Sequence, residues 1–219
     1  MVLARSARWS VFIVLATLVG CTREEAVEPE TEPTTPTPTQ LNLPAGVLAQ
    51  LGAPNFPADN PLTIEGVALG RKLFYEKALS NDFTLSCGSC HVQANAFSDP
   101  RPFSEGTNGA HGPRNSMSLV NLAWADRMFW DGRVQGLEAQ AHDPVINPLE
   151  MRNTWPVVED RLNASTEYRG LFKTAFGSEE VDSTMVTKAL AQFVRSIVSF
   201  DSPFDRYWYG GDITAMSEE

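Results

Sequence analysis

The sequence predicts an all-α domain with long loops, and three observations support that class. Apolar residues recur at helical spacing in several segments, most strongly over residues 183–199. No segment shows the alternation of apolar and polar residues that is typical of a half-buried strand. Residues 99–115 are rich in Gly, Pro, Asn and Ser. They predict a long loop, and long ordered loops in compact domains are often functional.

Helices are expected in the following order. The first begins near Thr63, capped by Thr63 or Asn60, after an irregular, proline-rich lead-in over residues 41–61. The others are expected at 117–124, 134–142, 154–163, 166–176 and 183–199.

The most informative motif is a Cys-x-x-Cys-His run formed by Cys87, Cys90 and His91. Two thiols at this spacing can both add to the vinyl groups of one porphyrin, and the next imidazole can bind its iron. The motif therefore predicts one covalent c-type haem with His91 as proximal ligand. The expected fold is a cytochrome-c-like haem domain with a redox function.

Two other uses of the cysteine pair are weighed against haem. A zinc site needs further ligands, and the chain offers only Cys21, His111 and His142, with no second cysteine pair. A thioredoxin-like disulfide centre needs a strand before the pair and a helix after it. Phe97-Ser98-Asp99-Pro100 follows soon after the pair and does not resemble a long helix.

The N-terminus predicts export. Residues 1–20 combine Arg5 and Arg8 with a short apolar run that ends at Gly20 before Cys21. This pattern is similar to a bacterial lipoprotein signal peptide with Cys21 as the lipidated residue. The expected location is lipid-anchored on the periplasmic side of a cell-envelope membrane. An ordinary secretory signal, giving a soluble periplasmic protein, and an uncleaved anchor are the alternatives.

Composition separates the rest of the chain into an expected tether and an expected globular domain. Residues 21–40 are rich in Pro, Thr and Glu and are expected to form a disordered tether. Residues 41–219 are long enough for one domain with a sizeable core. The formal net charge of −10 argues against nucleic acid as a partner and is compatible with a basic electron donor.

Short motifs also follow one another in a specific order through the globular region. They are Leu69-Gly70-Arg71-Lys72-Leu73-Phe74, Leu79-Ser80, the haem motif, Ala96-Phe97-Ser98-Asp99, Gly112-Pro113-Arg114-Asn115, Ser118-Leu119-Val120-Asn121, Phe129-Trp130-Asp131-Gly132-Arg133, Leu137-Glu138-Ala139-Gln140-Ala141, Asn147-Pro148-Leu149-Glu150-Met151 and Phe204-Asp205-Arg206-Tyr207. From about residue 60 onward the chain resembles the bacterial di-haem cytochrome c peroxidase family, which includes methylamine-utilisation-type di-haem enzymes.

The resemblance implies two cytochrome-c-like domains, one with the haem that reduces peroxide and one whose haem accepts electrons from a donor protein. This chain resembles only the first, amino-terminal domain, and it has one haem motif. The expected second haem domain is absent or belongs to another polypeptide.

The resemblance also implies site residues. Glu150 matches the catalytic glutamate, which would move a proton between the two peroxide oxygens, and Gln140 matches a distal amide that orients peroxide. In several relatives a loop histidine occupies the iron position that peroxide needs. The matching position here is Thr107, which implies that the iron is free to bind peroxide. His111 in the same loop is an alternative ligand, but a solvated loop histidine is favoured.

Further matches carry less specific roles. Trp130 matches a tryptophan between the two haems, and from residue type alone it is read as a core aromatic. Asn115 matches a position that helps to bind calcium at the domain interface, which requires ligands from the second domain. Asp131 and Arg133 are expected to form a structural ion pair, and His142 to lie at the surface or behind the site.

The first functional hypothesis is a peroxidase domain that reduces hydrogen peroxide with electrons from a small redox protein, such as a cytochrome c or a cupredoxin. The second is a membrane-tethered electron-transfer cytochrome, because Met117, Met128 and Met151 are available as axial ligands. The third is an inactive fragment of a longer di-haem enzyme.

Overall fold

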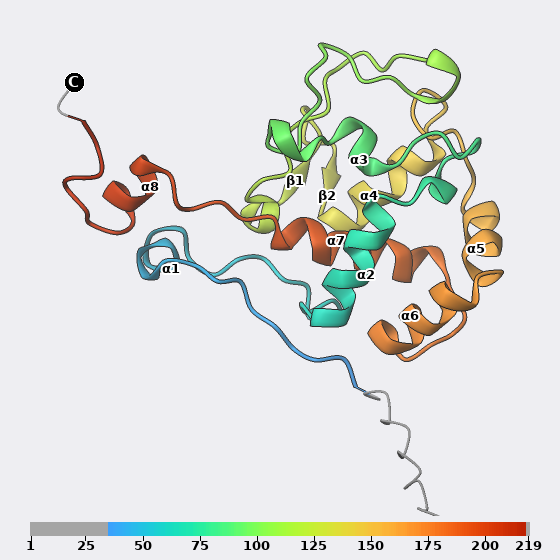
Figure 1. Ribbon diagram of the computed structural model, residues 1–219, viewed down its shortest axis with the longest axis horizontal. Helices are drawn as coiled ribbons and strands as arrows, with labels where there is room; N and C mark the ends of the chain where they lie inside the picture. The colour runs from blue at the N-terminus through green and yellow to red at the C-terminus, as the bar shows by residue number, and fades with distance from the viewer. Residues whose placement is uncertain (1–34, 218–219) are drawn as a thin grey trace, which may run out of the picture. The chain divides into compact units, whose positions relative to one another are not determined.

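Helices α2 (Ile64–Phe74) and α7 (Ser183–Ser196) cross at the centre of the fold in this computed structural model, which describes residues 35–217 (Figure 1). The remaining elements are α1 (Ala45–Leu51), α3 (Cys87–Cys90), β1 (Arg127–Met128), β2 (Val134–Gln135), α4 (Leu137–Ile146), α5 (Trp155–Asn163), α6 (Thr166–Phe176) and α8 (Pro203–Trp208). The structure is therefore mostly helical, as predicted. Among the described helices, none is both long enough and apolar enough to cross a membrane.

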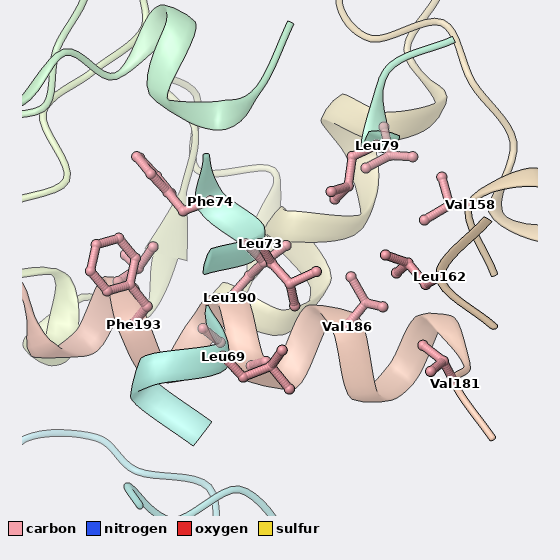
Figure 2. Close-up of a cluster of buried hydrophobic side chains, with 14 of the residues drawn as sticks. Leu69, Leu73, Phe74, Leu79, Val158, Leu162, Val181, Val186, Leu190 and Phe193 are labelled. Atoms are coloured by element: carbon pink, nitrogen blue, oxygen red, sulfur yellow. The ribbon is translucent and has the colours of Figure 1, made fainter. Parts of the chain in front are cut away.

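The core lies between α2 and α7 and extends towards α5 and α6. Leu69 and Leu73 of α2 are buried against the α7 face that carries Val186 and Leu190 (Figure 2). Val158 and Leu162 of α5 continue the same apolar cluster. Burial of such side chains contributes about 1.5–3 kcal/mol each, so this cluster is the main source of stability.

Two glycines allow α2 to approach α7 closely. A Cβ atom on Gly70 would collide with the carbonyl oxygen of Ala189 and lie 2.8 Å from Cβ of Phe193. A Cβ atom on Gly66, one turn earlier, would collide with the side-chain amide of Gln192. The crossing therefore requires the absence of a side chain at both positions.

Polar groups tie the same helices at their edges. Thr63 caps α2 by accepting from the Gly66 N–H, and Gln192 of α7 accepts from the Thr63 N–H at 2.9 Å. Arg195 of α7 donates two hydrogen bonds, of 2.6 and 2.7 Å, to the carboxylate of Glu138 on α4. Arg195 is 3% exposed, so this bidentate pair fixes the start of α4 against α7.

Three of the six predicted helices are confirmed, including the cap at Thr63. The helix predicted near Thr63 is α2, and those predicted at 154–163 and 166–176 are α5 and α6. The helix predicted at 134–142 begins later, because residues 134–135 pair with β1 and Gly136 adopts φ 83°. It also continues to Ile146.

One tertiary contact explains two further corrections. The helix predicted at 117–124 is only a single 3₁₀ turn over Leu122–Trp124, and the helix predicted at 183–199 ends at Ser196. Asn121 adopts φ 61° and exchanges hydrogen bonds with Ser199, and its N–H donates to the Ile197 carbonyl. These contacts keep the segments around Asn121 and Ser199 from forming helix, because hydrogen bonds between the two segments replace the hydrogen bonds within a helix.

Other differences lie near the two ends of the described chain. Helix α1 forms inside the lead-in that was predicted to be irregular, and its Gln50 side chain donates to the Trp208 carbonyl at the end of α8. The N–H of Thr37 donates to Glu65 on α2, and the N–H of Thr39 donates to the Leu62 carbonyl. The structured domain thus extends a few residues before position 41. The predicted signal peptide, Cys21 and most of the predicted tether lie outside the described residues.

The α2–α7 contact gives a stability prediction. We expect Gly70→Ala to lower the free energy of unfolding by about 1–3 kcal/mol or more, because the new methyl group overpacks the crossing. Gly170→Ala on α6 is the matched control, since its Cβ atom meets nothing within 4 Å. That control should be neutral or stabilising by up to about 1 kcal/mol. Urea unfolding of both variants measures the difference, and equal effects would contradict the close contact.

Candidate haem-binding site

A cavity of about 550 Å³ lies beside the haem motif. Its volume falls within the range of cofactor and small-molecule sites, about 300–1,000 Å³. Six segments contribute to its wall: the end of α2, the α3 turn, the loop after it, the β1–β2 hairpin, α4 with the segment that follows it, and α7. Most of the lining is apolar, with Phe74, Leu190 and Val194 supplied by the two crossing helices.

The haem motif forms a short helical turn on this wall. The Ser89 hydroxyl accepts a hydrogen bond from the Ser86 N–H at 3.0 Å, which fixes the turn that carries the two cysteines. Cys87 and Cys90 both line the cavity as free thiols. Burial, followed by the neighbouring Cys90 thiol, raises the pKa of Cys87 to about 12. The thiol is therefore neutral, unlike the low-pKa thiolate of a redox-active disulfide centre.

The zinc alternative finds no support in the described part of the chain. Among residues 35–217, no group of three or more His, Cys, Asp or Glu side chains is placed to hold a metal ion. His111 is exposed, and His142 packs at a tilt against Trp155 with ring centroids 5.2 Å apart. Neither histidine lines the cavity. For His111 this agrees with the expectation of a solvated loop residue that does not bind the iron.

His91 is oriented as a metal ligand. Its Nδ1 lies 2.9 Å from the carbonyl oxygen of Phe97, so a proton on Nδ1 donates to that carbonyl and Nε2 remains free. Ala96 and Phe97 adopt φ values of 52° and 56°, and this left-handed turn folds the chain back towards His91. Burial lowers the pKa of His91, although the carbonyls of Phe97 and Met117 oppose this effect. The imidazole is therefore neutral at pH 7, as iron ligation requires.

These residues fit a c-type haem. The two thiols and the imidazole lie on one wall of a mostly apolar cavity of suitable volume, and the hydrogen bond at Nδ1 selects the tautomer that can bind iron. The structure thus brings together the three attachment residues that the sequence predicted.

Glu150 and Gln140 line the same cavity as the haem motif. Gln140 lies on α4, and Glu150 lies in the segment Asn147–Met151 that follows this helix. The side-chain amide of Asn147 donates to Oε1 of Glu150 at 2.8 Å. Burial raises the pKa of Glu150, while the Asn147 amide and the positive charge of Arg133 hold that rise back. Glu150 is therefore a half-buried carboxyl group, and not the surface acid that its immediate sequence would also allow.

The long loop is clamped onto the Glu150 segment. The N–H of Thr107 donates to the Glu150 carbonyl at 2.9 Å. A Cβ atom on Gly106 would collide with the Leu149 carbonyl, so this glycine permits the contact. Thr107 itself is 2% exposed and is not part of the cavity lining. Thr107, which stands where the resemblance implies a ligating histidine in several relatives, therefore supports Glu150 through its backbone N–H.

The mouth of the cavity is polar. The indole N–H of Trp130 donates to the Asn115 carbonyl at 2.9 Å, and Trp130 is 63% exposed. The interpretation of Trp130 as a core aromatic is therefore wrong, because its ring lies at the surface beside the cavity. The predicted ion pair between Asp131 and Arg133 is present at 3.0 Å. Arg133 also lines the cavity, which its sequence context did not reveal.

Pro144 and Asn115 also line the cavity. Pro144 lies inside α4 and cannot donate to the Gln140 carbonyl one turn before it, so the helix lacks one backbone hydrogen bond where it faces the cavity. Pro144 lies outside the helix predicted at 134–142, so this feature was not predicted. The side-chain amide of Asn115 donates to the carbonyls of Asp99 and Arg101, which fixes the loop at this edge.

Comparisons with known proteins agree with this site. The fold and the site are those of a helical c-type haem protein. A sequence profile described as "Di-haem cytochrome c peroxidase" matches residues 64–213. The chain belongs to the di-haem cytochrome c peroxidase family.

Several relatives are similar over the same region. Methylamine utilization protein MauG of Methylorubrum extorquens is 43% identical over 164 residues, covering 74% of this chain and 46% of its own. Cytochrome c551 peroxidase of Pseudomonas aeruginosa is 36% identical, covering 69% and 44%. The crystal structure of a MauG-like protein associated with microbial copper homeostasis matches with a TM-score of 0.74 and 35% identity, over 82% of this chain and 52% of that one. The chain thus spans about half the length of the curated relatives it matches.

The contact between Asn147 and Glu150 gives a titration prediction. We expect Asn147→Asp to raise the pKa of Glu150, because a hydrogen-bond donor is replaced by a like charge while the oxygen that accepts from the Leu149 N–H is kept. An acid with a raised pKa stays protonated to higher pH, so the Glu150 titration moves to higher pH. Carbon-13 NMR of glutamate-labelled protein, assigned with Glu150→Gln, measures the shift.

Asn95→Asp is the control for this titration, since it adds the same charge on an exposed turn outside the cavity lining. An unchanged or lowered pKa of Glu150 in Asn147→Asp would show that the amide does not stabilise the ionised carboxylate.

Proposed function

We propose that this chain is a c-type haem peroxidase domain that reduces hydrogen peroxide to water with electrons from a small redox protein. One haem is attached through Cys87 and Cys90, with His91 as the proximal ligand. Hydrogen peroxide, two electrons and two protons then give two molecules of water. The family membership and the peroxidases among the relatives support this proposal.

One observation carries the proposal: Glu150 and Gln140 line the same cavity as Cys87, Cys90 and His91. A carboxyl group near bound peroxide can accept a proton from one oxygen and return it to the other, which makes that oxygen leave as water. An electron carrier has no need of such a group in its haem pocket.

A haem bound here would supply an iron capable of redox chemistry with peroxide. The chain's own residues do the rest. His91 would hold the iron through Nε2, and the Phe97 carbonyl keeps that ring in position. Gln140 would donate a hydrogen bond that orients peroxide, and Glu150 would move the proton. The Asn147 amide opposes the rise in the pKa of Glu150 that burial causes.

The partner proteins and the second haem belong to the same proposal. The family is di-haem, and this chain has one Cys-x-x-Cys-His motif. A second haem domain would therefore deliver electrons, received from a cytochrome c or a cupredoxin, and Trp130 at the exposed mouth is a candidate path. A calcium ion at that interface would need ligands from the second domain in addition to Asn115. The proposed location is periplasmic, with a lipid anchor at Cys21.

A specific observation favours one second candidate, an electron-transfer cytochrome. Met117, Met128 and Met151 all line the cavity, and a thioether on the iron opposite His91 would close it to peroxide. Against this candidate, Met128 and Met151 are 2% and 5% exposed and contribute to the apolar core.

The test is Glu150→Gln in the haem-loaded protein. We expect the reaction with hydrogen peroxide to slow by about 10²- to 10⁴-fold, the usual contribution of one general acid–base group, while haem content is unchanged. Stopped-flow absorbance measures the rate. Glu105→Gln is the matched control, because Glu105 also lines the cavity but is exposed and paired with Arg101. A wild-type rate in Glu150→Gln would contradict the proposed role.

A further inference from the structure

Three charged side chains form a cluster at the cavity mouth. Arg114 Nη1 lies 2.9 Å from Oδ2 of Asp131, and Arg133 Nη1 lies 3.0 Å from Oδ1 of the same carboxylate. Hydrogen bonds, from Arg114 above all and then from Arg133, lower the pKa of Asp131 to about 2, despite an opposing effect of burial. Asp131 is therefore ionised at neutral pH, and the cluster has two positive charges and one negative charge.

The cluster faces the haem cavity and has unused donors. Arg114 and Arg133 are the two positively charged side chains among the described residues that line it. Each guanidinium has five N–H groups, yet only Nη1 of each donates to a side chain or carbonyl of the described residues. The remaining donors are available to another acceptor.

The geometry also holds Arg133 still. Its guanidinium carbon lies 3.6 Å from the centroid of the Phe129 ring, a cation–π contact. Gly132, with φ 66°, forms the turn that brings Asp131 and Arg133 together, while Arg114 arrives from the long loop. Asp131 thus orients two cations from different segments towards one space.

A purely structural role explains this arrangement poorly. The three side chains are 39–52% exposed, and ion pairs at such exposure contribute only about 0–1 kcal/mol to stability. Joining the loop to the hairpin would not require both cations to line a mostly apolar cavity, or to leave most of their donors without a partner among the described residues.

The ligand chemistry follows from the proposed cofactor. A haem carries two carboxylate groups in addition to the vinyl groups that react with cysteines. A carboxylate at the edge of an apolar cavity needs a cation or several donors, because its desolvation is otherwise costly. The planar guanidinium matches a carboxylate better than any other side chain does.

We propose that Arg114 and Arg133, oriented by their shared carboxylate Asp131, bind the two carboxylates of the haem. This inference rests on the proposed function only in requiring that the haem occupy the cavity. It makes Asp131 a positioning residue and the two arginines binding residues.

The test is the haem reduction potential, measured by spectroelectrochemistry on the haem-loaded full chain. Ferric haem has one more positive charge than ferrous haem, so removing a nearby cation stabilises the ferric form. We expect Arg114→Gln and Arg133→Gln to lower the potential. Asp131→Asn should raise it, because an anion is lost while both cations stay. Arg133→Lys, which keeps the charge, should stay closer to the wild type than Arg133→Gln.

Arg127→Gln is the matched control, since Arg127 is an exposed arginine on β1 outside the cavity lining, and its potential should equal that of the wild type. Shifts of the same sign for Asp131→Asn and Arg133→Gln, or no shift in either, would overturn the inference. Haem content of the wild type, read from its absorbance, tests the proposed function separately. A chain without haem refutes that function, whereas a haem-loaded chain with unshifted potentials refutes only the arginine assignment.

Discussion

The close crossing of α2 and α7 is the constraint on which the rest of the structure depends. Gly66 and Gly70 let the helices approach until the α2 backbone meets Ala189. The crossing then sets the position of Phe74, whose ring lies 6.4 Å from His91 and 5.1 Å from Phe193 between centroids. The proximal side of the proposed haem site is thus built directly on the core. A shift at the crossing would move the imidazole that is to bind iron.

The distal side is attached to the same core less directly. Arg195 of α7 holds Glu138 at the start of α4, and α4 carries Gln140 into the cavity. Beyond the helix, Glu150 depends on loop contacts, namely the Asn147 side chain and the Thr107 N–H. The two parts of the site are therefore supported differently. The packed helices position His91, whereas hydrogen bonds from a loop position Glu150. The loop is the part where small sequence changes would alter reactivity without unfolding the domain.

Much of this could be predicted from the sequence, for identifiable reasons. The strongly amphipathic segments became α5, α6 and α7 because their apolar faces are local signals, and Thr63 caps α2 as its residue type suggests. The contact between Asn121 and Ser199 could not be predicted, since nothing local says that residues 78 positions apart bond to each other. That contact removes one predicted helix and shortens another.

The residues of the site also differ in whether the sequence alone predicts them. Cys87, Cys90 and His91 are adjacent in sequence, so their spacing alone predicts a haem. Glu150 and Gln140 have no such local signal and were found only through the family resemblance. The exposure of Trp130 and the place of Arg133 on the cavity wall depend on how the β1–β2 hairpin turns at Gly132. Neither could be read from residue type, which favours a buried tryptophan and a solvated arginine.

A haem attached at Cys87 and Cys90 and held by His91 would share one cavity with Glu150 and Gln140. The most direct measurement is the optical spectrum of the haem-loaded protein before and after addition of hydrogen peroxide. We expect a high-spin ferric haem whose spectrum changes rapidly with peroxide. A low-spin spectrum with a methionine-to-iron band, unaffected by peroxide, would contradict it.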